Sequence, residues 1–252
     1  MGRSLRIMSA NLWSGAAHPE ALAGLVASLE IDVLATQELT ADQADAIGEV
    51  LPFGLLEPHP KYHGMGIALR HPARVDHIEM PFRSARRARL GAGDWPDLGR
   101  DVEVLNVHVA APHVGPLGSG FPKRRQQLRQ LERYLIDGHQ QRDARDRGPT
   151  EGETASPDQA APRAQVLVGD FNSTPVWPVY RRLSRLMTDG AVVVAQRRGR
   201  PVRPTWGPWS GSPRLLRIDH GFVRGLDVEE FRVVEVPGSD HSAVVMDVVP
   251  GS

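Results

Sequence analysis

The residues with the clearest chemical potential follow an apolar run at residues 166–168 that ends at a glycine. Asp170 and Asn172 come next, and Thr174 and Pro175 follow them. The apolar run is typical of a buried strand, and Thr174 and Pro175 predict the N-cap and first residue of a helix. Side chains two positions apart in an extended chain point the same way, so Asp170 and Asn172 are expected to face one pocket. A carboxylate there can accept a proton, and an amide can hold an oxygen atom.

Polar residues also end or interrupt other apolar segments, from one end of the chain to the other. These residues are Asn11, Glu38, His108, Asp219, Asp240 and His241. Each has an ordinary explanation when taken alone, as a turn residue, a residue before a helix, a hydrogen-bonded core histidine or half of a surface ion pair. Their combination is harder to explain in this way, because buried charge is costly unless it is paired or bound to a metal. We therefore predict that they meet around one site.

The residue types at this predicted site favour a hard divalent cation. Carboxylate and amide oxygens, in a chain without cysteine, suit magnesium, with manganese as the alternative. Zinc would normally require more imidazole or thiolate ligands. A metal, a carboxylate that positions water and a histidine that donates hydrogen bonds are what in-line hydrolysis of a phosphate ester requires. The pattern therefore predicts a site for a hard divalent cation, with chemistry that is consistent with phosphate-ester hydrolysis.

Strands and helices must hold these residues in place. Apolar or alternating runs predict strands at residues 5–10, 33–36, 67–69, 102–109, 166–168, 218–223 and 244–249. Helical spacing of apolar residues predicts helices that begin at Pro19, after Thr40, at residues 121–122 and at Pro175. Several neighbouring strands have no helix between them, which argues against a doubly wound parallel sheet. A four-layered α/β sandwich, with two mixed sheets packed face to face and helices outside, fits this order of elements.

One stretch, residues 143–163, differs from the rest of the chain. It is rich in Gly, Pro and charged residues and contains almost nothing apolar. Such a segment cannot bury enough surface to offset the entropy lost on ordering. We expect a disordered surface insertion within a single domain that covers residues 1–252, because the strands on both sides belong to the same core.

Composition limits the classes of protein that fit. The chain has 252 residues, of which 40% are hydrophobic, enough for one large core. Its 30 basic residues balance 30 acidic ones, which argues against a general binder of polyanions. No apolar run approaches the roughly 18 residues that span a bilayer. We expect a monomer that is cytoplasmic as given, with export or membrane anchoring only through a segment absent from this chain.

Six short segments resemble the endonuclease/exonuclease/phosphatase superfamily, which has the DNase I-like fold. They are residues 9–13 (SANLW), 37–38 (QE), 106–108 (NVH), 169–172 (GDFN), 217–220 (RIDH) and 239–242 (SDHS). They occur in the order typical of the family and extend over nearly the whole chain. The resemblance implies a four-layered α/β sandwich with the site at one edge of the two sheets.

The resemblance also implies which residues bind the metal. Glu38 matches the principal magnesium ligand of the family, and Asn11 matches a residue beside the ion. Asp240 matches a further contact to the metal or to its bound water.

The same resemblance implies roles in catalysis. Asp170 and Asn172 match the pair that orients the attacking water and holds a phosphate oxygen. Asp219 matches the carboxylate that orients a histidine, and His241 matches that histidine. His108 matches a histidine near the leaving group.

Substrate contacts are less clearly marked. Arg124 and Arg125 open the helix predicted after the strand of His108, so we predict that they bind a phosphate. Trp206 is predicted to wall the pocket. The leading function is a phosphatase or phosphodiesterase acting on a small or lipid-like phosphate. A metal-dependent nuclease acting on DNA or RNA is the alternative, and an inactive phosphate-binding module of the same fold is the remaining one.

Overall fold

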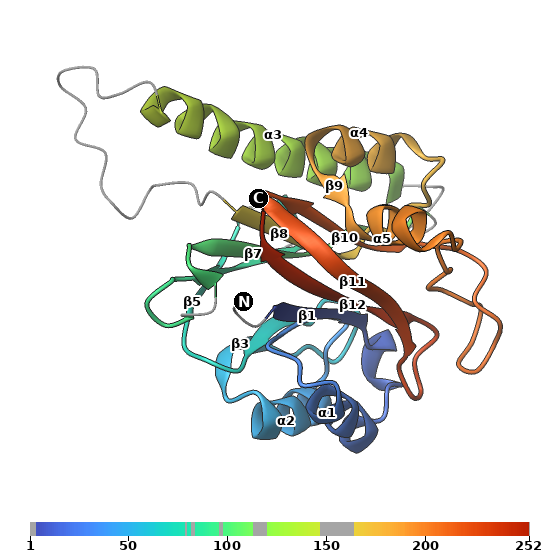
Figure 1. Cartoon of the computed structure of the whole chain (residues 1–252). Helices are drawn as coiled ribbons and strands as arrows, with labels where there is room; N and C mark the ends of the chain where they lie inside the picture. Colours follow the sequence, from blue (N-terminus) through green and yellow to red (C-terminus); the bar gives the residue numbers. More distant parts are fainter. Residues whose placement is uncertain are drawn as a thin grey trace.

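Two six-stranded β-sheets form the centre of the protein (Figure 1). The computed structural model describes residues 4–78, 80–81, 84–95, 98–112, 120–146 and 164–251. The first sheet has the strand order β11 (Leu226–Glu235), β12 (Ser242–Pro250), β1 (Leu5–Asn11), β2 (Val33–Gln37), β4 (Met65–Leu69) and β3 (Phe53–Glu57). The second has the order β5 (Arg74–His77), β6 (Ala85–Leu90), β7 (Val102–His108), β8 (Ala164–Asp170), β10 (Asp219–Arg224) and β9 (Thr188–Asp189).

Both sheets are mixed and share one pairing pattern. A single parallel pair lies near the centre of each, β1 with β2 in the first sheet and β7 with β8 in the second. The other paired strands of both sheets are antiparallel. The predicted pair of mixed sheets is therefore confirmed.

Helices cover the outer face of each sheet (Figure 1). On the first sheet these are α1 (Pro19–Ser28) and α2 (Ala41–Val50), and on the second α3 (Gly120–Asp146) and α4 (Pro178–Leu186). A fifth helix, α5 (Gly190–Arg198), packs beside β10 and β11. The four layers confirm the predicted α/β sandwich. None of the described helices combines the length and the apolar character that crossing a bilayer requires.

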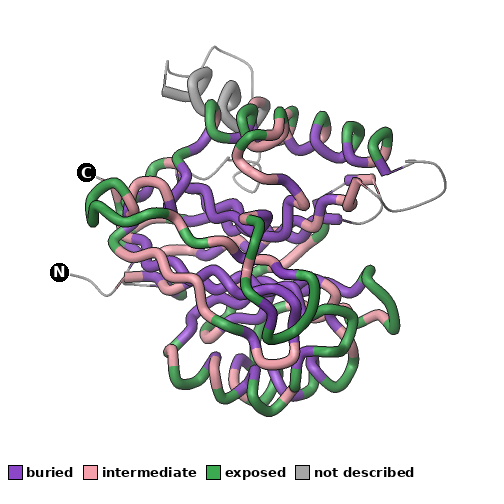
Figure 2. Tube along the Cα trace, turned by 90° about the vertical axis from the view of Figure 1, so that its right-hand side faces the viewer, coloured by how far each residue is buried: buried purple, intermediate pink, exposed green. Residues whose placement is uncertain are grey.

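Alternation along the strands divides the core into three clusters of buried residues. Figure 2 shows that buried positions are concentrated in the central strands. In β1, Ile7 points between the two sheets and packs with Val104 and Val166 of the second sheet. The next residue, Met8, belongs to the layer beneath α1 and α2. A third layer joins the second sheet to α3 and α4. Successive strand residues face opposite sides of a sheet, so two-sided burial produces the near-continuous apolar runs seen in the sequence.

A polar contact joins the two sheets within this apolar interior. Gln37 at the end of β2 donates from Nε2 to Asn106 Oδ1 of β7 at 2.6 Å. Asn106 Nδ2 in turn donates to the backbone oxygens of Thr36 and Gly66 at 2.9 Å. Gln37 and Asn106 are both fully buried. Because each bond has a defined partner on the opposite sheet, the pair fixes how the sheets are placed relative to one another.

The structure differs from the sequence-based expectation in several elements. The helix expected from Thr174 and Pro175 begins only at Pro178, because residues 174–177 form a turn in which Trp177 N–H donates to Thr174 O. Strands β3, β5, β6, β9 and β11 and helix α5 were not predicted. Of the expected insertion at residues 143–163, residues 143–146 are the end of α3, and residues 147–163 lie outside the described part of the chain.

Candidate active site

Strand ends from both sheets meet at one edge of the sandwich. In the parallel pair of the second sheet, His108 lies opposite Asp170. Asp170 in turn pairs with Asp219 at the start of the antiparallel β10. In the first sheet, Asn11 lies opposite Gln37, the residue before Glu38. The carboxyl ends of two parallel strands lie at the same edge of a sheet. The polar residues that follow the two central pairs therefore lie at one edge of the sandwich.

Gly169 allows β8 to bring Asp170 close to β7. Its φ of +143° lies in the region that favours glycine, and a Cβ built there would meet Val107 O at 1.9 Å. A larger residue would push the two strands apart just before Asp170. The glycine of the GDFN segment is thus required by backbone geometry.

Asp170 is buried and held by several donors. Its Oδ1 accepts from the backbone N–H of Asn172 at 2.7 Å. Its Oδ2 accepts from Asn172 Nδ2 at 3.0 Å and from Asn11 Nδ2 at 3.1 Å. His108 Nε2 lies 3.7 Å from the same oxygen. Burial raises the pKa of Asp170 to about 6, and nearby Asp219 adds to the rise while His241 and His108 oppose it.

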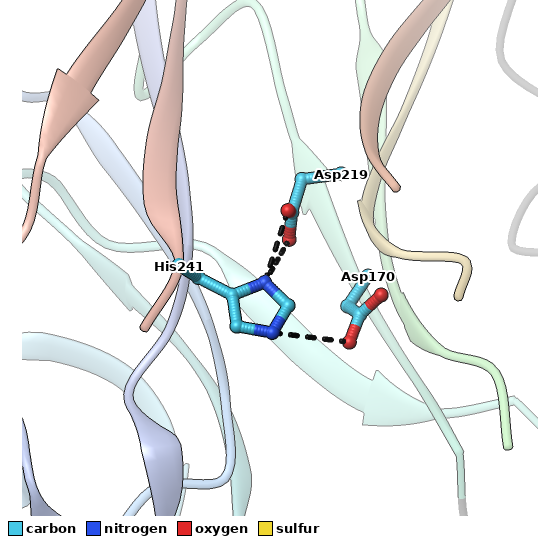
Figure 3. A group of neighbouring side chains, drawn as sticks. All are labelled: Asp170, Asp219 and His241. Carbon is cyan, nitrogen blue, oxygen red and sulfur yellow. Dashed lines mark hydrogen bonds and ion pairs between the residues drawn. The ribbon is translucent and has the colours of Figure 1, made fainter. Parts of the chain in front are cut away.

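His241 lies between Asp219 and Asp170 (Figure 3). Its Nδ1 is 3.0 Å from Asp219 Oδ2, and its Nε2 is 4.0 Å from Asp170 Oδ2. Burial alone would lower the pKa of His241, but the charge of Asp219 and its hydrogen bond, then Asp170 and Asp240, raise it to about 9. At neutral pH the ring is therefore an imidazolium, with Nδ1–H directed to Asp219 and Nε2–H on the side of Asp170.

Two hydroxyl groups hold the backbone next to Asp219 and His241 in place. Thr205 Oγ1 accepts from the backbone N–H groups of Ile218 and Asp219. Ser239 Oγ accepts from the N–H of His241 and donates to Asn11 O at 2.8 Å. The loop that carries His241 is thereby bound to the end of β1, although 228 positions separate Ser239 from Asn11 in the chain.

Glu38 follows β2 with a left-handed backbone, at φ +56°. Its Oε2 accepts from Ser14 Oγ at 2.7 Å, and its Oε1 lies 3.3 Å from Asn11 Nδ2. His108 Nε2 lies 3.8 Å from Oε1. Of the five described non-glycine residues with positive φ, four line the site, namely Trp13, Ser14, Glu38 and Asn172. Backbone strain of this kind concentrates where function requires a particular side-chain direction.

Asp240 lies beside His241 and has one unused oxygen. Its Oδ2 accepts from Trp206 Nε1 at 3.0 Å. Its Oδ1 is buried and has no hydrogen-bond partner among the described residues, and it lies 3.9 Å from His241 Nε2. Burial raises the pKa of Asp240, and the negative charge of Glu38 adds to the rise while His241 opposes it. An unpartnered carboxylate oxygen near a second carboxylate is the environment that a cation would stabilise.

These groups open into one cavity of about 530 Å³. Seven of the predicted residues line it: Glu38, His108, Asp170, Asn172, Trp206, Asp240 and His241. Asn11 and Asp219 lie behind the lining and hold Asp170 and His241 through hydrogen bonds. Trp206 contributes to the wall and also positions Asp240.

Neither predicted arginine lines the cavity, although Arg124 lies behind its wall, where the charge of Asp170 acts on it. Arg124 is buried, donates to Ala110 O at 3.2 Å and lies over the ring of Trp177 at 5.2 Å. Burial lowers the pKa of Arg124 to about 10. Arg125 is exposed and does not line the cavity. Lys123 and Gln127 line it instead, because residues four apart share one face of α3.

Two sets of donors could hold a metal ion. Ligand atoms of Asp170, Asp219 and His241 all lie within 4.8 Å of one another. The second set consists of Glu38 and Asp240. Both line the cavity, and the negative charge of Glu38 contributes to the raised pKa of Asp240. Asn11 presents its amide nitrogen to Glu38, while its oxygen accepts from the N–H of Trp13 at 3.0 Å. The second set retains an unpartnered oxygen, and the first has its members bonded to one another.

Sequence reasoning missed several residues of the site. Ser14, Tyr62, His63, Lys123, Gln127 and Trp177 line the cavity. Ser14 directly follows the SANLW segment, so its proximity to Asn11 was the available signal. The others lie in loops or on a helix face whose approach to the strand ends depends on tertiary packing.

The fold and the site together define a class of protein. A sandwich of two mixed sheets that gathers carboxylates, amides and histidines at the strand ends is the arrangement of phosphoesterase hydrolases with a DNase I-like fold. The chain belongs to the endonuclease/exonuclease/phosphatase family, whose model matches residues 8–241. Members of the family are phosphoesterase hydrolases and typically depend on a divalent metal. The resemblance seen in the sequence is thereby confirmed.

Solved structures support the same fold. The human nocturnin catalytic domain with bound sulfate is 18% identical, with a TM-score of 0.67 over 100% of this chain and 96% of that one. The mannosyl-6-phosphatase of Bacteroides thetaiotaomicron is 18% identical, with a TM-score of 0.63 over 98% and 100%. A humanized TDP2 of D. rerio is 15% identical, with a TM-score of 0.64 over 97% and 98%. Among curated proteins, no sequence matches the chain with significance.

Proposed function

We propose that this protein is a divalent-metal-dependent phosphoesterase that hydrolyses its substrate by in-line attack of water. The observation that carries the proposal is the opposed pair formed by Asp170 and His241. Their pKa values are displaced to about 6 and about 9, so at neutral pH a carboxylate and an imidazolium face one cavity. This pairing provides both an acceptor for a water proton and a donor for a phosphoryl oxygen.

Asp170 is proposed to position the attacking water and to accept its proton. A pKa of about 6 leaves the group ionised at neutral pH and more basic than an ordinary aspartate. Asn172 and Asn11 fix both oxygens of the carboxylate, so its orientation is set before substrate binds. Water held by Asp170 can be aligned with the scissile bond without further movement of the carboxylate.

His241 is proposed to donate a hydrogen bond from Nε2 to a phosphoryl oxygen. Asp219 holds Nδ1–H and thereby keeps the other nitrogen directed toward the cavity. Negative charge that develops on the phosphoryl group is then met by a fixed positive donor. His108, whose Nε2 lies 3.7 Å from Asp170 and 3.8 Å from Glu38, is proposed to act near the leaving oxygen.

Glu38 and Asp240 are the proposed metal ligands, with Asn11 beside them. A cation held there would supply neutralisation of the charge on the phosphate. Glu38 and Asp240 are preferred to the group of Asp170, Asp219 and His241, because a protonated histidine is a poor ligand. Oxygen donors favour magnesium, with manganese as the alternative.

The substrate is proposed to be a small or lipid-like phosphate ester. The chain carries no excess of positive charge for a polyanion, and the cavity has the size of a small-ligand site. A similar fold occurs in a mannosyl-6-phosphatase. Nucleic acid is the alternative substrate, as for other phosphoesterases of this family.

The proposal is tested by phosphate release from a panel of phosphomonoesters, phosphodiesters, phospholipids and plasmid DNA with magnesium, manganese or calcium. Glu38→Gln and His241→Gln are expected to fold normally by circular dichroism and to lose turnover by roughly a hundredfold or more. Arg125→Ala serves as control, since Arg125 lies outside the cavity. Near-wild-type metal-dependent hydrolysis by both variants would refute the assignment, and plasmid nicking alone would favour the nuclease.

A further inference from the structure

Both lysines of the chain lie at the rim of the active-site cavity. Lys61 and Lys123 are the only lysines among 252 residues. Lys123, in the first turn of α3, lines the cavity. Lys61 lies in the turn between β3 and β4, next to Tyr62 and His63, which also line it. The helix on the second sheet and the turn of the first sheet thus bring the two lysine-bearing segments to one rim, where the charges of both lysines act on His63.

The turn that carries Lys61 is fixed against the end of β2. His59 N–H donates to Leu39 O at 2.9 Å, and Leu39 N–H donates to Gly64 O at 3.1 Å. A Cβ at Gly64 would meet Leu39 O at 1.9 Å, so the turn approaches as closely as a backbone can. Within it, Lys61 N–H donates to His59 Nδ1 at 3.1 Å. The turn is therefore a built part of the cavity wall, directly after the proposed metal ligand.

Positive groups at this rim act on one another. Burial lowers the pKa of His63, and the charges of His59, Lys123 and Lys61 lower it further, while Glu38 opposes them. The rings of Tyr62 and His63 pack with centroids 4.2 Å apart. Among the described residues, no carboxylate forms an ion pair with Lys61. The charges of both lysines thus reach one part of the cavity wall, where they would attract an anionic ligand.

The simplest alternative is that the two lysines compensate the negative charge of Glu38. Glu38 already accepts from Ser14 at 2.7 Å and lies within reach of Asn11, and the proposed cation would neutralise it further. Lys123, Tyr62 and His63 line the same cavity as Asp170, Asp240 and His241. One ligand in the cavity could therefore contact both this rim and the reacting groups.

We propose that the rim formed by Lys61, His63 and Lys123 binds a second anionic group of the substrate whose ester is cleaved at Asp170 and His241. This inference rests on the proposed function. The preferred ligand is thus a small molecule with two anionic groups, a phosphate ester at one end and a phosphate or carboxylate at the other. A cavity of about 530 Å³ accommodates both ends of such a ligand.

The test uses stable phosphonates as probes of the intact protein. α,ω-Alkane bisphosphonates of increasing length are compared with alkyl monophosphonates of the same length, in excess magnesium. Inhibition of bis(p-nitrophenyl) phosphate hydrolysis and isothermal titration calorimetry each give the ratio of monophosphonate to bisphosphonate affinity. An ω-phosphonocarboxylate series shows whether the second anion is a phosphate or a carboxylate, and a short oligonucleotide shows whether a nucleic-acid backbone supplies it.

In the wild type, a bisphosphonate of the optimal chain length is expected to bind about tenfold more tightly than the matching monophosphonate. Lys123→Met and Lys61→Met are each expected to reduce this ratio by about threefold to fivefold. Arg125→Met, on the exposed face of α3, should keep the wild-type ratio. A ratio near one at every length, or equal ratios in the wild type and both lysine variants, would overturn the inference. If no ester is hydrolysed, the proposed function fails, and calorimetry still decides whether the rim binds the second anion.

Discussion

Replacement of Asp219 by Asn removes the group that holds His241 protonated. Asp219 Oδ2 lies 3.0 Å from His241 Nδ1, and Asp219 is 2% exposed, so solvent screens the pair little. Burial favours the neutral ring, and only the neighbouring carboxylates, Asp219 first, raise its pKa to about 9. Without Asp219, burial dominates and the pKa of His241 is expected to fall to 6.5 or below.

The magnitude of this change follows from the pKa values. A fall from about 9 to 6.5 corresponds to roughly 3 kcal/mol of lost stabilisation of the imidazolium. At pH 7.5 the protonated fraction of His241 would drop from nearly all molecules to about a tenth. Loss of the fixed ring orientation adds to this effect, so we expect kcat/KM to fall by roughly a hundredfold to ten-thousandfold.

The pH profile separates this mechanism from a general loss of structure. Wild-type activity should rise as Asp170 ionises near pH 6 and fall as His241 deprotonates near pH 9. In Asp219→Asn the alkaline limb should move toward pH 6.5 or below, and NMR titration of His241 should show the same fall in pKa. Asp76→Asn, in an ion pair with Arg87 outside the cavity, is the matched control. An alkaline limb that stays near pH 9 in Asp219→Asn would refute the reasoning.

Further predictions concern the metal, the backbone and the sheet interface. Glu38→Gln should weaken magnesium and manganese binding by at least about tenfold in calorimetry, and an unchanged affinity would place the metal elsewhere. Gly169→Ala should lower stability by about 2 kcal/mol or more in thermal unfolding and should also lower turnover, because the new Cβ meets Val107 O. Gly93→Ala is the control and should have neither effect, because Gly93 has open space around it. Asn106→Leu should cost about 2–4 kcal/mol in chemical denaturation, because Gln37 and two carbonyl groups lose their partner; a smaller loss than for an exposed site would contradict its role. Folded-state stability contributed by His241 should be complete below pH 6.5 and lost as pH rises through 9, since its folded pKa is raised, and a flat profile there in urea titrations would contradict this.

Site residues at strand ends could be predicted from the sequence, because polar side chains follow apolar runs there and an ordinary core would not bury them. Asp170, Asp219 and His241 stand next to apolar runs, where a core would not place them. The period of the strands then determined which of them share a face. Elements with a strong apolar pattern, such as the strand at Val102–His108, were predicted almost to the residue.

Features that depend on long-range pairing could not be predicted in this way. Strand β6, with the sequence Ala-Arg-Arg-Ala-Arg-Leu, lacks the apolar run of a strand. Two of its arginines pair with carboxylates, Arg87 with Asp76 of the adjacent β5 and Arg86 with Glu57 of β3 in the other sheet. Likewise Arg124 was predicted to contact substrate, but its side chain packs under Trp177, while Lys123 lines the cavity. Which side of a helix faces a site depends on how that helix docks.

The two sheets repeat one pattern, and the site lies where the repeats meet. Each has antiparallel strands on both sides of one parallel pair, and each pair ends in polar residues. The first pair leads to Asn11 and Glu38, and the second leads to His108 and Asp170. Asn11 Nδ2 joins the two sets by reaching both Glu38 and Asp170, and the buried contact of Gln37 with Asn106 holds the sheets together directly beneath. The chemistry therefore depends on how the sheets are placed relative to one another, and a change in this buried contact should alter turnover without touching any residue that lines the cavity.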